Sequence, residues 1–157
     1  MIARSKKVMY METELDTFER MKGFTSMAIN KNPKEYTRQY VDEDFEVTDI
    51  TGISTSIDYT FDQIAENEVH TKLIEIIDNE KIGDDAVVSM LSVDFTEAGT
   101  EPDSFVAAKR DFAVIPGSEG DSLDAYTYGG TFRVKSERVI GEATTTDEWK
   151  TATFVAD

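Results

Sequence analysis

The sequence predicts a mainly β fold: two packed antiparallel sheets, forming a β-sandwich or barrel, with one flanking α-helix around residues 63–81. Three observations lead to this prediction. Short segments rich in β-branched and aromatic residues recur along the chain with turn signals between them, which is typical of sandwiches and barrels. Only one segment has the 3.6-residue period of an amphipathic helix. The 157 residues fit one domain, which we place at residues 1–157.

We expect about eight strands, each a short run with alternating or continuous apolar character. They lie at residues 8–11, 24–30, 53–61, 86–95, 105–115, 126–134, 139–143 and 149–155. Turns are expected in the passage up to Gly23. Segment 86–95 has apolar residues on both sides, as in a central strand covered on both faces. Gly129 and Gly130 interrupt a strand pattern, which predicts a bulge or a close backbone approach.

The helix around residues 63–81 is expected to bury one face against a sheet. Its apolar side consists of Val69, Leu73, Ile76 and Ile77, which recur at helical spacing, while glutamates lie mostly on the other side. Asp62 or Asn67 can cap its N-terminus through a side-chain oxygen. Gly83 is the expected stop at its C-terminus. The four apolar residues are therefore predicted to be part of the core.

Residues 31–50 differ from the rest of the chain. They form a long polar connection that contains Pro33, although loops between the strands of a compact domain are usually short. Tyr36, Arg38 and Tyr40 lie in it, and Tyr together with Arg is a composition enriched in protein interfaces. Long loops of this kind often carry function. We therefore expect this segment to contact another protein.

The chain is strongly acidic, with 32 Asp and Glu residues against 16 Lys and Arg and a net charge of −16. Tight binding of nucleic acid is disfavoured, because neutralising phosphates needs Lys and Arg. The acid either keeps the surface soluble or repels a polyanion that must not adhere. The absence of cysteine excludes disulfides, thiolate metal sites and a cysteine nucleophile. No apolar run approaches transmembrane length, and the basic first residues are not followed by an apolar stretch, so we expect no signal peptide.

No residue pattern points to an enzyme. His70 is the only histidine and lies beside the apolar face of the helix, so we interpret it as structural. Asp42, Asp44 and Glu46 have the spacing of a calcium loop, but they are followed by neither the glycine nor the final glutamate that an EF-hand requires. We expect no catalytic residue, no metal and no cofactor.

Other functions remain open at this point. Residues 119–124 either hold a weakly bound calcium ion or form a polar hairpin tip. A binding module for a small ligand or carbohydrate needs a concave aromatic pocket, which Tyr126, Tyr128 and Trp149 can supply. A carboxylate-based hydrolase needs an isolated acidic pair whose pKa values are pushed apart.

Several motifs follow one another in a characteristic order. After the strand that ends Asp58-Tyr-Thr-Phe-Asp comes the helix, and then Ile82-Gly-Asp-Asp-Ala-Val-Val, Val93-Asp-Phe, Ala108-Lys-Arg, Val114-Ile-Pro-Gly, Tyr128-Gly-Gly-Thr-Phe, Val139-Ile-Gly-Glu-Ala-Thr and Thr151-Ala-Thr-Phe. In this order and over this total length, the chain resembles the major tail tube proteins of long-tailed bacteriophages. The resemblance runs from about Val8 to the C-terminus.

The resemblance implies a single tail-tube-like domain in which two antiparallel sheets pack orthogonally beside a helix. It implies hexameric rings that stack into a tube, with one sheet of each subunit contributing to a central β-barrel. Residues 31–50 would be the long hairpin arm, whose Tyr36, Arg38 and Tyr40 reach neighbouring subunits. The tube would be a structural part of the virion, assembled in the cytoplasm of the host bacterium, through which DNA is ejected.

The implied partners are copies of the chain itself, tail terminator, tape measure and baseplate or tip proteins, and double-stranded DNA that passes without specific binding; no membrane is implied. Asp58, on the polar side of strand 53–61, and Glu46 and Asp49, in the adjoining acidic strand, are expected to face the lumen. A lumen for DNA must repel phosphate. Type VI secretion and contractile injection tubes share the fold, so a secretion or injection tube is the alternative within this resemblance.

Overall fold

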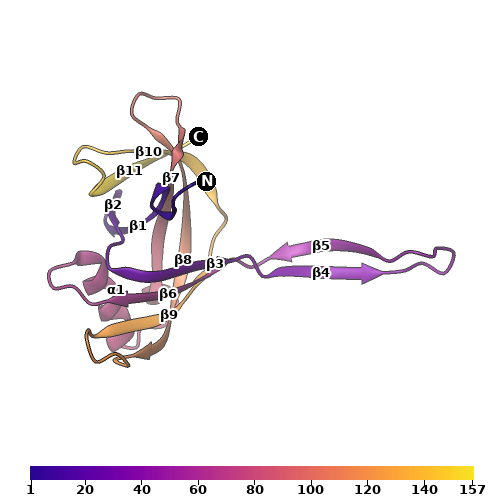
Figure 1. Ribbon diagram of the computed structural model, residues 1–157, viewed down its shortest axis with the longest axis horizontal. Coiled ribbons are helices and arrows are strands. Elements are labelled where there is room, and N and C mark those ends of the chain that lie inside the picture. Colours follow the sequence, from indigo (N-terminus) through magenta and orange to yellow (C-terminus); the bar gives the residue numbers. More distant parts are fainter.

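A computed structural model describes residues 1–157 and confirms a mainly β fold with one α-helix (Figure 1). The elements are η1 (Arg4–Lys6), β1 (Lys7–Glu14), β2 (Thr17–Arg20), β3 (Phe24–Asn30), β4 (Pro33–Arg38), β5 (Val47–Ile53), β6 (Ser56–Asp62), α1 (Glu68–Asp78), η2 (Gly83–Ala86), β7 (Val87–Ala98), β8 (Phe105–Glu119), β9 (Thr127–Val134), β10 (Val139–Thr144) and β11 (Thr151–Ala156). Strand β2 lies in the passage predicted as turns and was not expected. Strands β4 and β5 form the hairpin that the resemblance implied at residues 31–50.

Nine strands form one hydrogen-bonded antiparallel sheet in the order β10-β11-β2-β1-β7-β8-β9-β6-β3. The sheet closes on part of itself because β8 has three partners: β7, β10 along residues 105–109, and β9 from Phe112 onward. Strands β1, β2, β7, β8, β10 and β11 therefore complete a small barrel, while β9, β6 and β3 continue from the far half of β8 as an open sheet. The two packed sheets expected from the sequence are these two parts, and their strands cross at a steep angle (Figure 1).

Each part has its own hydrophobic core. The barrel is filled by seven buried residues that include Tyr10 and Leu91. A larger cluster of sixteen, which includes Met11 and Met90, lies between α1 and the open sheet. Because successive side chains of a strand point to opposite faces, neighbouring residues such as Met90 and Leu91 enter different cores. This confirms β7 as a central strand covered on both faces.

The helix α1 is shorter than the predicted segment 63–81 at both ends. Glu66 has a positive φ of 61°, which interrupts a helix, so Asn67 becomes the N-cap and Asp62 stays in β6. The Asn67 side chain accepts a hydrogen bond from the His70 backbone N–H at 3.1 Å. Asn79 ends the helix, and Gly83 instead begins η2. The buried residues of α1 are Val69, His70, Leu73, Ile76 and Ile77.

No helix of this chain combines the length and apolar character needed to cross a membrane.

Two further strand predictions can be compared with the structure. Residue Ile53 does not share the buried face of its expected strand: it ends β5 and is 58% exposed, and β6 begins only at Ser56. The close approach predicted at Gly130 is confirmed, because a Cβ atom there would collide with the Ile115 carbonyl oxygen. The pairing of β8 with β9 shifts register at this point, between Pro116 and Glu119.

His70 is structural and neutral. Its side chain is 1% exposed and stacks on Phe61 with ring centroids 4.6 Å apart. The Nδ1 atom accepts a hydrogen bond from the Ile64 backbone N–H at 3.0 Å, which leaves Nε2 to donate to the Lys22 carbonyl oxygen at 2.6 Å. Burial lowers the pKa of His70 below its usual value of 6.5, because the charged ring loses its hydration. The ring thus connects the start of α1 to the loop between β2 and β3.

We expect His70 to make the protein less stable as the pH falls below about 6.5. The unfolded chain binds the proton first, since the folded pKa is the lower one, so the stabilising contribution is complete above that pH and is lost toward the folded pKa. Urea unfolding of the wild type and of His70→Gln at about pH 7.5 and about pH 5.5 measures this. The wild type should lose more stability than the variant over this interval; equal losses would show that the ring is protonated in the folded state without cost.

Two buried tyrosines differ in how their hydroxyl groups are satisfied. Tyr10, in the barrel, donates to the Trp149 carbonyl oxygen at 2.8 Å. Tyr59, in the core under α1, stacks on Phe132 with centroids 4.1 Å apart, but its hydroxyl has no hydrogen-bond partner. Burial raises the pKa of Tyr59 to about 12. The aromatic ring of Tyr59 is therefore what stabilises this position, while its hydroxyl is a cost.

Replacing each tyrosine by phenylalanine should consequently have opposite results. Tyr59→Phe should leave the free energy of unfolding unchanged or raise it by up to about 1–3 kcal/mol, because a buried unsatisfied hydroxyl is removed. Tyr10→Phe, the matched control, should lower it by about 0.5–1.5 kcal/mol through the lost hydrogen bond. Denaturant midpoints measure both; a Tyr59→Phe variant less stable than Tyr10→Phe would mean that the Tyr59 hydroxyl has a partner.

Candidate functional site

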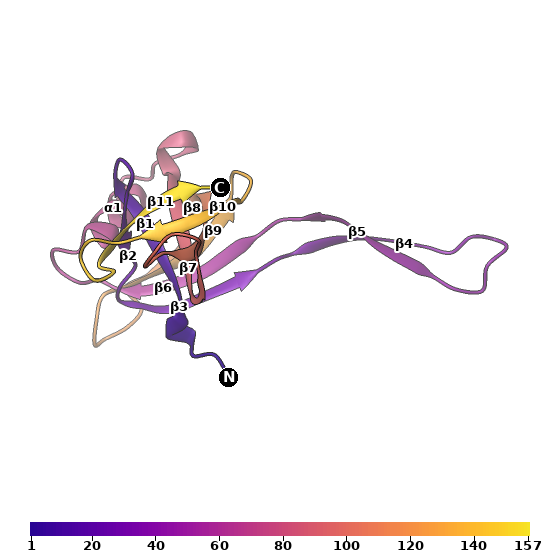
Figure 2. The same ribbon diagram turned by 90° about the horizontal axis from the view of Figure 1, so that it is seen from above.

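The segment expected to contact other proteins is a two-stranded hairpin that projects far from the body, and we call residues 33–53 the arm (Figure 1, Figure 2). Strands β4 and β5 pair only with each other. The arm continues the hairpin β3–β6 outward, and it leaves the body where the Ser54 N–H donates to the Lys31 carbonyl oxygen at 3.1 Å. Asn32, with a φ of 47°, donates from its side chain to the Ser54 carbonyl and to the Ser56 hydroxyl, both at 2.9 Å. The root of the arm is thus well fastened.

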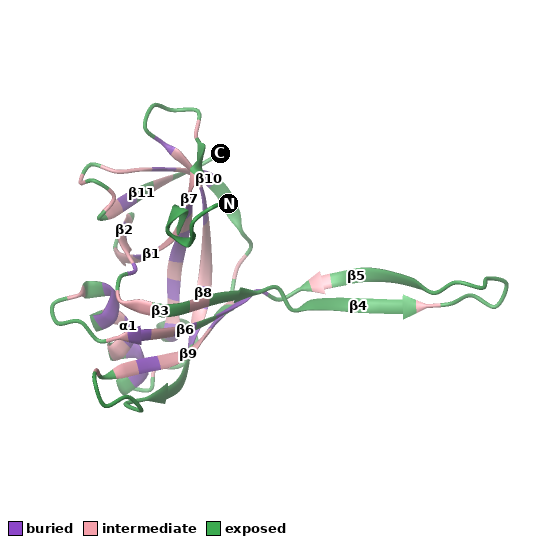
Figure 3. Ribbon diagram, viewed as in Figure 1, coloured by how far each residue is buried: buried purple, intermediate pink, exposed green.

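The arm packs against nothing in its own chain. Every residue from 39 to 51 is exposed (Figure 3). The large exposed apolar side chains of the arm are Tyr36, Tyr40, Val41, Phe45, Val47, Ile50 and Ile53. An exposed apolar surface rimmed by polar residues marks an interaction site. Both long edges of this two-stranded ribbon also leave backbone groups unpaired, as edge strands do.

Tyr36, Arg38 and Tyr40 do come together on the arm. The Arg38 guanidinium lies 5.3 Å from the ring centroid of Tyr36 and 5.7 Å from that of Tyr40, and its Nε donates to the Tyr40 hydroxyl at 2.9 Å. Its Nη1 atom forms an ion pair with Asp49 of the opposite strand at 2.6 Å. This hydrogen bond to Asp49, followed by the one to Tyr40, raises the pKa of Arg38. The cluster therefore ties β4 to β5 and stiffens the arm.

The three expected lumen residues do not share one sheet, which corrects the expectation that they line adjoining strands. Glu46 lies at the turn of the arm, and Asp49 lies in β5 and is held by Arg38. Only Asp58 is in the main sheet. The reason is that β5 pairs with β4 alone, so the chain between Glu46 and Ile53 never joins the sheet that contains β6.

Asp58 stands on the face of the open sheet that α1 does not cover. Its carboxylate accepts hydrogen bonds from the Asn30 side chain at 3.1 Å and from the Thr131 hydroxyl at 3.0 Å. On the same face Arg133 is exposed, and the Ser89 hydroxyl donates to Asp111 at 2.5 Å. No helix covers this face, and short polar side chains stand along its strands. It is a solvated surface that can adjoin water or a polar ligand.

The aromatic residues that would line a carbohydrate pocket do not converge. Tyr126 and Tyr128 contact each other on β9 and the turn before it, with centroids 5.3 Å apart. Trp149 packs instead on Phe95 and Phe105 at the barrel, at 5.1 and 5.5 Å.

Residues 119–124 form the hairpin tip between β8 and β9, and no group of three or more histidine or carboxylate side chains is arranged to hold a metal ion.

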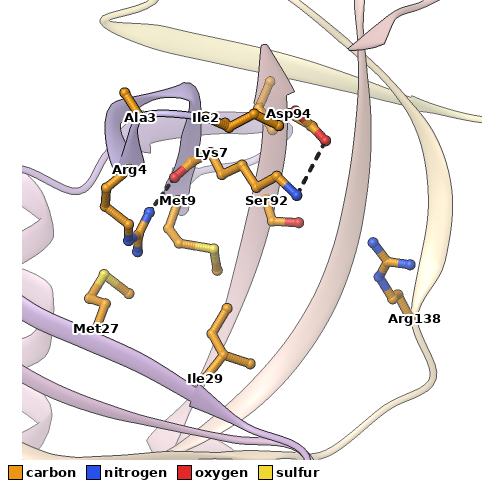
Figure 4. A pocket seen from close by; sticks show the side chains of 11 residues that line it. Ile2, Ala3, Arg4, Lys7, Met9, Met27, Ile29, Ser92, Asp94 and Arg138 are labelled. Atoms are coloured by element: carbon orange, nitrogen blue, oxygen red, sulfur yellow. Dashed lines mark hydrogen bonds and ion pairs between the residues drawn. The ribbon is translucent and has the colours of Figure 1, made fainter. Parts of the chain in front are cut away.

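A groove that the sequence did not indicate lies between β3 and the strands β1 and β7, and we call it the basic groove (Figure 4). It has a volume of about 520 Å³ and continues into a second, smaller hollow next to the root of the arm. Its apolar floor includes Met9, Met27 and Ile29. The cations that line the two parts are Arg4, Lys7, Lys31, Arg110 and Arg138. They are spread over the whole sequence, so no local charge run reveals them.

No protein-family model matches this chain, and no characterised protein matches it in sequence. Solved structures do match it in fold. A chain of the tail of an empty gene transfer agent particle, refined with C6 symmetry, superposes with a TM-score of 0.64 at 10% identity, covering 88% of this chain and 97% of that one. A chain of the virion of the native gene transfer agent particle gives a TM-score of 0.60 at 11% identity, covering 99% and 100%. At these identities the likeness shows the fold alone.

Proposed function

We propose that this chain is a structural virion protein that assembles as hexameric rings, stacked into the tail tube of a phage-like particle, and that the tube conducts DNA. The observation that carries the proposal is the arm. It is regular, internally stiffened and rooted in the sheet, yet it exposes seven large apolar side chains to water. Such a surface is typical of an interaction site. We propose that the partner is a second copy of the chain.

The fold likeness supports copies of the chain as that partner. The matched chains come from a particle tail with C6 symmetry and from a complete particle. An arm that contacts a different surface of the next copy makes a head-to-tail interface, and such interfaces generate rings when they close and filaments when they do not. A tube of stacked rings combines closed contacts within each ring with open-ended contacts between successive rings. Tail terminator, tape measure and baseplate or tip proteins are the further partners that we propose for the ends and bore of this tube.

The uncovered face of the open sheet supports the conduit. A tube for DNA needs an inner wall that is negative on balance, so that phosphates are not retained. The face around Asp58 is largely polar; it carries Arg133 as well as Asp58 and Asp111, and the whole chain has a net charge of −16. We propose that this face lines the bore, where symmetry repeats Asp58 around each ring. A field of this kind is felt within about 8 Å of the wall at physiological salt.

Removing the arm should abolish assembly and leave the body folded. Residues 33–53 are replaced by one glycine, so that Lys31-Asn32-Gly-Ser54 forms a tight turn; the Lys31 to Ser54 hydrogen bond and the positive φ of Asn32 already have the geometry that an Asn-Gly turn needs. Electron microscopy at rising concentration, compared with the full chain, measures assembly, and denaturant unfolding measures the body. Tubes formed by the armless chain would contradict the proposal.

A charge reversal at Asp58 should make the bore adhesive. Asp58→Lys tubes should bind duplex DNA, and the binding should weaken as salt rises because counterions are released on phosphate contact. Wild-type tubes should not retain DNA. Asp85→Lys, an exposed position between α1 and β7, is the control with the same charge change. If the two variants retain DNA equally, or neither does, Asp58 does not face the bore.

A further inference from the structure

The basic groove concentrates positive charge in a chain that has twice as many acids as bases. Five cations line its two parts, against one carboxylate, Asp94. Only Lys7 forms an ion pair, with Asp94 at 3.8 Å. Arg110 donates to the neutral Ser136 carbonyl and Thr55 hydroxyl at 2.8 and 3.3 Å. The positive charge is therefore left without compensation by the chain itself.

The floor of the groove is apolar and adaptable. Ile29 is 50% exposed, although it stands on the side of β3 that faces the core. Met9 of β1 and Met27 of β3 also line this floor (Figure 4). Methionine side chains adjust to irregular partners. A ligand for this groove therefore needs apolar groups for the floor and negative charge for the rim, and a phosphate backbone alone supplies only the second.

The tip of the arm, residues 39–46, has both properties. It carries four carboxylates and no cation. Its apolar side chains, Val41 and Phe45, are 108% and 78% exposed, and nothing in their own chain covers them. Residues with this composition gain free energy by burying their apolar groups beside opposite charge. The tip of the arm is thus the segment of this protein that matches the basic groove best.

The tip cannot reach the groove of its own chain. Strand β4 alone extends about 20 Å, at about 3.4 Å per residue, and it leads away from the body (Figure 2). The groove lies at the root of the arm, where Lys31 and Thr55 line it. Any tip in the groove therefore comes from another copy.

We infer that the arm tip of one copy docks in the basic groove of the next. Val41 and Phe45 cover the methionine floor, and the tip carboxylates pair with Arg4, Lys31 and Arg138. The inference rests on the proposed assembly and names the acceptor surface that the arm uses. The tip and the groove are different surfaces, and each copy has both. One copy can therefore dock its tip in a second copy while its own groove receives the tip of a third, so the contact continues from copy to copy.

Engineered cysteines test the contact, since the chain has none of its own. Val41→Cys combined with Ile29→Cys should give disulfide-linked oligomers when assembled protein is oxidised. Val41→Cys combined with Leu123→Cys, in the exposed loop between β8 and β9, is the control and should stay uncrosslinked. Equal crosslinking of both pairs, or of neither in assembled tubes, overturns the inference.

Charge reversal tests it independently. The groove variant Arg4→Glu with Arg138→Glu and the tip variant Asp42→Lys with Asp44→Lys should each lose assembly, whereas Lys135→Glu with Lys150→Glu, at exposed positions outside the groove, should keep it. In an equal mixture the two non-assembling variants should associate with each other, because the unaltered acidic tip of the groove variant meets the unaltered basic groove of the tip variant. If both variants form tubes alone, the groove assignment is wrong while the proposed tube function stands.

Two other outcomes separate the inference from the function on which it rests. If the wild type forms no tubes under any condition, the proposed function fails; crosslinking of the Val41–Ile29 pair would then still support the contact between copies, and its absence would refute it. Duplex DNA is the other possible occupant of the groove, and fluorescence anisotropy with a duplex DNA fragment tests it. Binding by the wild type that the groove variant loses would assign the groove to phosphate and overturn the inference.

Discussion

The structure depends on the way β8 divides its hydrogen bonds. A strand pairs with only two neighbours at any point along its length, so the fifteen residues of β8 give their first part to β10 and their later part to β9, with β7 along the other edge. This makes the barrel and the open sheet one hydrogen-bonded body with two cores. The hairpin β3–β6 pairs through β9 to this shared strand, which gives the arm a rigid root.

With the two cores closed, three surfaces of the chain are left incomplete. The arm exposes apolar side chains without a cover, the outer face of the open sheet is bare, and the basic groove holds five cations against one carboxylate, Asp94. In the proposed assembly each surface has a role: the arm contacts the next copy, the basic groove receives the arm tip, and the face around Asp58 lines the bore.

The elements that could be predicted from the sequence are those with a clear local periodicity. Eight strands and the buried face of α1 follow from alternation and helical spacing, and Gly130 from its place in a strand. Strand β2 was not predicted because its four residues are too short to show a period. Strands β4 and β5 were expected only through the resemblance, as a hairpin arm, because both faces of the arm are exposed and no buried face marks them. Glu46 and Asp49 were expected in a strand next to that of Asp58, but strand pairing is not local and β5 pairs with β4 alone; their place in a lumen stays a prediction. The groove could not be predicted from the sequence, since Arg4 and Arg138 line the same groove only through the register of β1, β7, β8 and β10.

The net charge of −16 raises the question of how copies can associate in the proposed assembly. Copies that carry the same large net charge repel one another on average. The basic groove is an exception, and the acidic arm tip with its apolar side chains is the segment of this chain that matches it. General repulsion therefore does not oppose specific assembly; it penalises every wrong approach and leaves the tip-to-groove orientation as the favoured one, which is how charge patterns select a partner and a register.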